Sequence, residues 1–324
     1  MGTAMTDQRQ THPSQLGELL ARLRRIAPLW LWGAGLVAAL FAGILGGLPA
    51  IAILITWAVC WAGNTWIART TAGRWLAPVI FGLTLLILWE ITVRLYAVPT
   101  VILPAPTQIA VTLAANLPTL WADFVQTVVK GALTGWLIGC GAGIATGLLV
   151  ARSDVLRRGL LPVGNFVAAL PIVGTAPILV MWFGFGWESK AAVVVVMVFF
   201  PMLVNTVAGL ADTTAMQRDL MRTYGATPGQ DLRYLKLQAA LPFIFNGLKI
   251  ATTLALIGAI VAEFFGSPTV GLGFRISTEV GRLNLPMVWA SIVTAALAGS
   301  LSYGLIAALE KHLTFWHPSQ RARG

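Results

Sequence analysis

The chain has 324 residues, of which 57% are hydrophobic and only 10% are charged, and its mean hydropathy is +0.79. A soluble domain carries about 25% charged residues, so a water-soluble chain of this composition could not cover its own surface with polar groups. The net charge of +10 does not indicate nucleic-acid binding, because Lys and Arg stand in short gaps between apolar segments rather than on one basic face. Cys60 and Cys140 lie within apolar runs, which favours packing over a disulfide or a metal site.

Eight segments are apolar and long enough to cross a bilayer, whose hydrocarbon core of about 30 Å needs about 20 helical residues. We therefore predict an all-α integral membrane protein with spans at 29–46, 48–67, 76–97, 127–150, 160–183, 190–211, 243–265 and 287–309. Basic residues gather in alternate gaps, whereas the other gaps hold little beyond Lys190, Arg275 and Arg282. By the positive-inside rule, this pattern predicts a multi-pass membrane protein with both termini in the cytoplasm.

The N-terminal part consists of a polar cytoplasmic tail, 1–28, and a tryptophan-rich transmembrane hairpin, 29–75. An uncleaved anchor is favoured over a signal peptide, because the first apolar run is followed at once by a second. No polar group in the hairpin has an evident chemical role, so we expect it to act as a scaffold or to contact lipid. Residues 76–318 form the predicted working domain, and 319–324 a short tail.

The span at 127–150 carries glycines at a strict spacing of four residues, which leaves one helix face without side chains. A neighbouring backbone can approach such a face closely. Tight packing within the chain is one interpretation, and a sliding or dimer-facing surface is the other. The residues are Gly131, Gly135, Gly139, Gly143 and Gly147.

Two acidic residues fall within predicted spans. Glu90 precedes Arg94 by one helical turn, which predicts a local ion pair. Glu263 is expected near the outer edge of its span, too shallow to favour a proton relay. The three histidines lie in the tails or at a span end, and no cluster of acids or cysteines offers metal or nucleophile chemistry. We therefore predict neither a catalytic nor a metal site.

The longest polar gap, 212–242, is predicted to form a helix, a break at 225–228 and then a short amphipathic helix. Thr227 can serve as N-cap of the second helix and Pro228 as its first residue. The apolar contacts of this helix are expected to come from Leu232, Leu235 and Leu237. A short helix held by a rigid turn outside the membrane is typical of a docking element for a soluble partner.

This gap resembles the EAA loop of bacterial ABC importer permeases, whose coupling helix seats in a cleft of the ATPase. It is most similar to the nitrate, sulfonate and taurine branch, in which the loop runs approximately Glu-Ala-Ala-Arg-Thr-Leu-Gly-Ala-Ser and ends in Ala-Ala-Leu-Pro. The matching residues are Arg222, Thr223, Gly225, Ala226, Ala239, Ala240, Leu241 and Pro242. The signature acid-Ala-Ala is replaced by Asp219, Leu220 and Met221, which keeps the charge but enlarges two small residues.

Further motifs of the branch follow in order along the chain and extend the resemblance over about 76–318. They are Leu103-Pro104-Ala105-Pro106, Leu170-Pro171-Ile172 through Pro177, Trp182-Phe183-Gly184-Phe185-Gly186, Phe200-Pro201 to Asn205-Thr206, Ala262-Glu263, Gly271-Leu272-Gly273 and Trp316-His317. The resemblance implies a six-helix type I ABC importer permease core, to which the N-terminal two-helix hairpin is an addition.

The resemblance also implies a non-catalytic permease subunit with several partners: an ABC ATPase dimer, a second permease copy, a periplasmic or lipid-anchored solute-binding protein and membrane lipid. Neither Walker motif occurs, so ATP and Mg are expected on the partner ATPase, with no cofactor on this chain. The implied solute is a small organic anion such as a sulfonate or taurine, a nitrate-like anion, or a heteroaromatic vitamin precursor. The alternative is a stand-alone secondary transporter, for which inverted repeats and deep ionisable residues would be expected.

Two sets of residues are assigned to these roles. Contact with the ATPase is predicted for Asp219, Arg222, Thr223, Tyr224, Gly225, Ala226, Thr227, Pro228, Leu232 and Leu235. Prolines remove helical hydrogen bonds, and such broken backbone is tolerated at membrane depth only inside protein or along a cavity. A fixed packing kink is one interpretation, and the other is a gate on the translocation path formed by Pro171, Ile172, Gly174, Thr175, Pro177, Met181, Phe199 and Met202.

Overall fold

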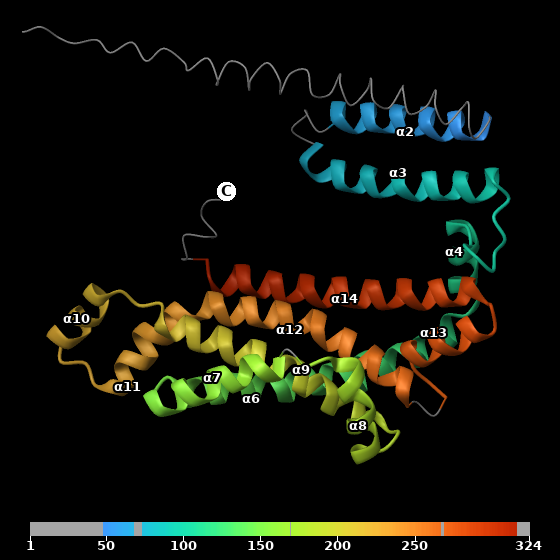
Figure 1. The fold of residues 1–324 in the computed structure, drawn as a ribbon. Helices are drawn as coiled ribbons and strands as arrows, with labels where there is room; N and C mark the ends of the chain where they lie inside the picture. The colour runs from blue at the N-terminus through green and yellow to red at the C-terminus, as the bar shows by residue number, and fades with distance from the viewer. Residues whose placement is uncertain (1–47, 68–72, 169, 267–268, 316–324) are drawn as a thin grey trace, which may run out of the picture. The chain divides into compact units, whose positions relative to one another are not determined.

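The computed structural model describes residues 48–67, 73–168, 170–266 and 269–315, and every regular element in these ranges is a helix (Figure 1). The predicted all-α class is therefore confirmed. The chain divides into two compact units, 1–107 and 108–324. The predicted span at 29–46 and the two tails at 1–28 and 319–324 lie outside the described residues.

In the first unit, α2 (Leu48–Ile67) packs against α3 (Gly73–Leu95). The predicted ion pair is confirmed, since Arg94 Nε donates to Glu90 Oε1. Glu90 also accepts from the backbone N–H of Thr107 at 3.0 Å and from its hydroxyl at 2.8 Å. The sequence grouped 76–97 with the permease core, whereas by packing α3 belongs to the unit that contains α2.

The second unit is built from helices that follow one another with short connections. In chain order they are α4 (Pro106–Ala115), α5 (Leu117–Phe124), the π-helical η1 (Val125–Leu133), α6 (Thr134–Val150), α7 (Asp154–Ala168), α8 (Ile172–Phe183), α9 (Trp187–Ala211), α10 (Ala215–Thr223), α11 (Pro228–Gln230), the π-helical η2 (Asp231–Lys236), α12 (Leu237–Phe265), α13 (Leu272–Gly281) and α14 (Leu285–Leu313). Residues 106–124 and 272–281 were not predicted as helices.

Five helical stretches in the described residues are long and apolar enough to cross a membrane: Pro78–Leu95, Leu117–Val150, Trp187–Ala211, Pro228–Phe265 and Leu285–Leu313. Shorter apolar stretches lie at Ile53–Gly63 and Ile172–Phe183. The prediction of one span at 160–183 is wrong, because this segment forms two helices, α7 and α8. Pro171 stands between them with extended backbone (φ −67°, ψ 114°), and a proline disfavours helical backbone at the residue before it.

Helix α9 occupies the centre of the second unit, between α6 and α12. Small and medium-sized side chains of these three helices and of η1 form the main buried cluster, which consists of Ala132, Cys140, Val194, Val198, Met202, Ala251, Ala255 and Ala259. Helices α10 and α11 lie at one end of these long helices, which we call the loop end, and α13 lies at the opposite end (Figure 1).

The five glycines spaced by four residues lie on the face of η1 and α6 that packs against α9. A methyl group built on Gly135 would stand 2.7 Å from the carbonyl oxygen of Ala191, and one built on Gly143 would stand 2.8 Å from that of Phe199. Real side chains do not approach backbone atoms so closely, so only glycine permits this contact. The glycine face thus lies within the chain, between two of its own membrane-spanning helices.

Candidate functional site

The polar loop at the loop end is shaped by two capping boxes. Thr214 accepts a hydrogen bond from the backbone N–H of Gln217, whose side chain accepts from the backbone N–H of Thr214. Thr227 and Gln230 repeat this arrangement at the start of α11, with Pro228 in the first helical turn. Each box satisfies backbone donors that a helix start leaves unpaired. The predicted N-cap at Thr227 is confirmed.

The turn between these two helices depends on Gly225, which has a φ of +66°. Its backbone N–H donates to Arg222 at 2.9 Å, and that of Ala226 donates to Met221 at 3.0 Å, which closes the end of α10. A left-handed residue at this position is the usual end of a helix and favours glycine. The direction in which the loop leaves α10 is therefore determined locally.

The loop exposes most of the residues that the sequence assigned to ATPase contact. Tyr224 is 80% exposed, and the side chains of Asp219 and Arg222 form only an exposed contact of 3.4 Å. Leu232 and Leu235 are half-buried. The predicted separate short helix is wrong in one respect: α11, η2 and α12 form one helical stretch, Pro228–Phe265, so the loop continues directly into a membrane-spanning helix.

Six of the eight predicted gate residues lie at or within α8, and the other two lie on α9. Pro171 is the N-cap of α8, whereas Pro177 lies inside α8 without interrupting it. Met181 is 83% exposed, while Met202 is fully buried in the main cluster between α6, α9 and α12. Of the remaining members, Ile172 is packed in the cluster of Ala176 and Phe199 in that of Val150. Thr175 is half-buried, and Gly174 is exposed with little around it.

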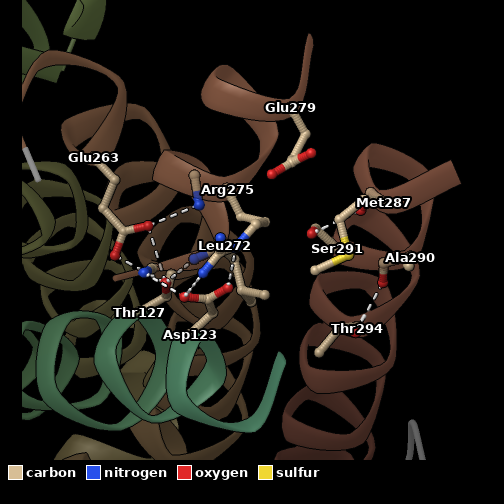
Figure 2. Close-up of polar contacts among 12 residues, drawn as sticks. Asp123, Thr127, Glu263, Leu272, Arg275, Glu279, Met287, Ala290, Ser291 and Thr294 are labelled. Atoms are coloured by element: carbon tan, nitrogen blue, oxygen red, sulfur yellow. Dashed lines mark hydrogen bonds and ion pairs between the residues drawn. The ribbon is translucent and has the colours of Figure 1, made fainter. Parts of the chain in front are cut away.

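At the opposite end, Asp123 of α5, Thr127 of η1, Glu263 of α12 and Arg275 of α13 meet in a buried polar cluster (Figure 2), which Lys190 of α9 completes. Three consecutive backbone N–H groups at the start of α13 donate to side chains of other helices. Gly271 donates to Asp123 at 2.8 Å, Leu272 to the Thr127 hydroxyl at 2.7 Å, and Gly273 to Glu263 at 2.7 Å. The Thr127 hydroxyl donates in turn to Glu263 at 2.8 Å. The start of α13 is thus attached to three helices at once.

Two basic residues balance the two acids of this polar cluster. Arg275 Nε donates to Asp123 at 2.8 Å, and this hydrogen bond raises the pKa of the Arg275 guanidinium above its ordinary value, so the side chain keeps its charge. Lys190 is 1% exposed, donates to the carbonyls of Phe185 (2.8 Å) and Gly266, and is electrostatically attracted to Glu263. Each acid of the polar cluster thus has a basic residue near it.

The backbone of α13 is adapted to this arrangement. Gly271 has a φ of +142°, and a methyl group there would stand 2.5 Å from a carboxylate oxygen of Glu263. A methyl group on Gly273 would stand 2.4 Å from the Ile260 carbonyl oxygen. The Gly-Leu-Gly sequence therefore allows the loop to lie directly on the end of α12. Beyond it, Glu279 accepts from Arg282 at 3.1 Å and from Asn284 at 2.8 Å.

Sequence reasoning did not find the polar cluster. Asp123 and Thr127 are ordinary polar residues along the chain, and their partners lie 136 to 152 positions away. Lys190 and Arg275 were counted only as loop charges. The available indications were Glu263, an acidic residue within an apolar stretch that the sequence assigned to the edge of its span, and the Gly271-Leu272-Gly273 motif. Among the described residues, no group of three or more His, Cys, Asp or Glu side chains is placed to hold a metal ion.

Comparison with known proteins places these features in one family. The family described as "Binding-protein-dependent transport system inner membrane component" matches residues 141–315. The formylaminopyrimidine transport permease ThiX of Halalkalibacterium halodurans is 34% identical over 245 residues, which cover 76% of this chain and 97% of ThiX. The riboflavin permease RibX of Chloroflexus aurantiacus is 32% identical over 72% of this chain and 88% of its own.

A third relative, the taurine transport permease TauC of Escherichia coli, is 30% identical and covers 72% of this chain and 86% of its own. Among solved structures, the MetNI methionine ABC transporter in inward-facing conformations aligns with 61% of this chain and 95% of its own, with 19% identity and a TM-score of 0.47.

The fold and the relatives define the class of this protein: it is a multi-span membrane transport permease without strands in its described part. More narrowly, the chain belongs to the family of binding-protein-dependent transport system inner membrane components and is the transmembrane permease of an ABC importer. The predicted family is therefore confirmed.

Proposed function

We propose that this permease forms the translocation path for a small organic anion or a heteroaromatic vitamin precursor, delivered by a solute-binding protein and moved at the expense of ATP. The family match over residues 141–315 carries this proposal, because it includes the whole loop 212–242 as well as α9, α12 and α14. Relatives named for formylaminopyrimidine, riboflavin, sulfonates and taurine support the two solute classes. Nitrate as a solute is supported only by the resemblance of the loop to the nitrate, sulfonate and taurine branch.

The proposed assembly contains two copies of this chain, an ATPase dimer that binds ATP and Mg, and a periplasmic or lipid-anchored binding protein. In this arrangement the loop end faces the cytoplasm, where the exposed Tyr224 and the half-buried Leu232 meet the ATPase. The polar cluster then faces the periplasm, and both termini lie on the cytoplasmic side of a bacterial inner membrane. The charge distribution of the gaps supports this orientation.

The function is tested by reconstituting the permease in proteoliposomes with the proposed ATPase dimer and solute-binding protein. We expect ATP-dependent uptake of radiolabelled taurine or of radiolabelled formylaminopyrimidine, and the two solutes distinguish the anionic class from the heteroaromatic class. Uptake that needs no ATPase and follows an ion gradient would instead identify a stand-alone secondary transporter.

Replacing Gly225 with valine tests the role of the loop in this assembly. The left-handed backbone at this position costs about 1–2 kcal/mol for a residue with a Cβ atom, so the turn that orients α11 should shift. We expect solute-stimulated ATP hydrolysis to fall about tenfold, since 1.4 kcal/mol corresponds to a factor of ten. The measurement compares stimulated and basal ATPase rates of the full complex.

Gly229→Ala provides the matched control, because Gly229 lies four residues away in the same loop, has open space around it and has no positive φ. Its stimulated rate should equal that of the unmodified complex. Equal stimulated rates for Gly225→Val and Gly229→Ala would argue against a coupling role for this turn.

A further inference from the structure

Two asparagines form an amide pair between α9 and α12. The side-chain amide of Asn246 donates to the side-chain oxygen of Asn205 at 3.1 Å, and that of Asn205 donates to the Pro201 carbonyl at 2.8 Å. Asn246 is exposed and Asn205 is half-buried. Each amide thus keeps one N–H, and Asn246 keeps its oxygen, without a hydrogen-bond partner among the described residues.

The amide pair lies inside the apolar section of both helices. Seven residues separate Asn205 from Asp212, and eight separate Asn246 from Gln238, which places the pair about 10 Å from the polar boundary at the loop end. An exposed amide is costly in lipid, where no water can satisfy it. Polar groups at this depth therefore face protein or a water-filled cavity.

Asn246 belongs to an exposed stripe along α12. The stripe consists of Asn246, Ile250, Thr253 and Ile257, at spacings of four, three and four residues. The opposite face of α12 is packed against the rest of the unit through Ala251, Ala255, Gly258, Ala259 and Ala262. The stripe is hence a single continuous surface with two polar positions.

Both charged side chains of α12 are engaged elsewhere. Lys249 pairs with Glu310 of α14 at 2.8 Å, and Glu263 belongs to the polar cluster at the opposite end. The amide pair itself therefore presents neutral hydrogen-bonding groups, and the neighbouring Lys249, three residues further along α12, is neutralised by Glu310. Neutral groups bind a passing solute weakly, and conduction requires binding that is weak enough to permit release.

We propose that the amide pair of Asn205 and Asn246 lines the translocation path and hydrogen-bonds the transported solute. Carboxylates, sulfonates and heteroaromatic rings all offer acceptors for the amide N–H groups, and ring N–H groups can be accepted by the Asn246 oxygen. This inference rests on the proposed function as an importer permease and adds where in the path the solute meets polar groups.

The first test measures access from water and needs no identified solute. In a background with Cys60→Ala and Cys140→Ala, Asn246→Cys is compared with Thr252→Cys in the complex with the ATPase. Thr252 lies on the same helix but lines an apolar groove of about 370 Å³ between η1, α6, α12 and α14. The probe is a membrane-impermeant sulfonated thiosulfonate, applied without nucleotide and with trapped ATP.

We expect Asn246→Cys to react at least tenfold faster than Thr252→Cys in one of the two nucleotide states. Equal rates in both states would overturn the assignment to the path. A disulfide between two copies at position 246, formed in both states without reaction toward the probe, would also overturn it and identify a dimer interface instead.

The second test measures uptake of taurine and formylaminopyrimidine in proteoliposomes. Asn246→Leu should lower the uptake of the transported solute at least tenfold, whereas Thr252→Val should keep the uptake of the unmodified permease. If the unmodified permease takes up a solute and Asn246→Leu takes it up equally fast, the proposed contact is contradicted and the proposed function stands. Absence of uptake by the unmodified permease contradicts the proposed function, while the reactivity at position 246 still decides whether the pair faces water.

Discussion

Replacing Arg275 with methionine should lower the stability of the permease more than any other single substitution of a charged residue in α13. Arg275 is the ion-pair partner of Asp123, which is fully buried and, within the described part of the chain, otherwise accepts a hydrogen bond only from the backbone N–H of Gly271. Removing one partner of a buried pair leaves an uncompensated charge and costs about 3–5 kcal/mol. We expect the apparent melting temperature of the purified protein in detergent to fall by roughly 10 °C.

Arg282→Met is the matched control for this measurement. Arg282 also pairs with an acid, Glu279, but its side chain is 66% exposed, and Glu279 keeps its hydrogen bond from Asn284. Exposed ion pairs contribute about 0–1 kcal/mol, so the melting temperature should change little. Adding Asp123→Asn to Arg275→Met should recover part of the loss, because the buried charge disappears. Equal melting temperatures for the two single variants would contradict the stabilising role of the polar cluster.

Alanine at two glycines of α6 should change stability in opposite directions. At Gly143, the new methyl group would stand 2.8 Å from the carbonyl oxygen of Phe199, so α6 and α9 must separate. Overpacking of this kind costs about 1–3 kcal/mol. At Gly141, two residues away and exposed, nothing lies within 4 Å, and alanine favours the helix by about 1 kcal/mol.

The measurement is the free energy of unfolding in mixed detergent micelles for Gly143→Ala and Gly141→Ala. We expect Gly143→Ala to be less stable than the unmodified protein and Gly141→Ala to be equally or more stable. A Gly143→Ala variant with unchanged stability would show that the helices can part at no cost, as a sliding surface requires.

Features with a local cause could be predicted from the sequence. The N-cap at Thr227 follows from its neighbours Pro228 and Gln230, and the ion pair of Glu90 and Arg94 follows from one helical turn. The glycines spaced by four residues indicated a close helix contact, because this spacing leaves one face of the helix without side chains. In each case the residues that interact are within a few positions of one another or repeat on one helix.

Features that depend on distant residues could not be predicted. The polar cluster forms because distant helices, among them η1, α12 and α13, meet. The residues around Thr127 in the sequence do not predict that Glu263 is its partner. The amide pair of Asn205 and Asn246 was likewise hidden, since the two residues are 41 positions apart. The interruption before α8 had a visible cause in Pro171, but the apolar composition of 160–183 favoured a single span.

Pro228–Phe265 is one continuous helical stretch, so a tilt of it would displace both of its ends together. At 1.5 Å per residue, its 38 residues measure about 57 Å, so a tilt of about 5° around the midpoint moves each end by about 2.5 Å. The two places where such a rod bends most easily are the π-turn at Asp231–Lys236 and Pro242, both near the loop end. Between Pro242 and Phe265 the helix contains no further proline, and Asn246 lies only four residues from Pro242.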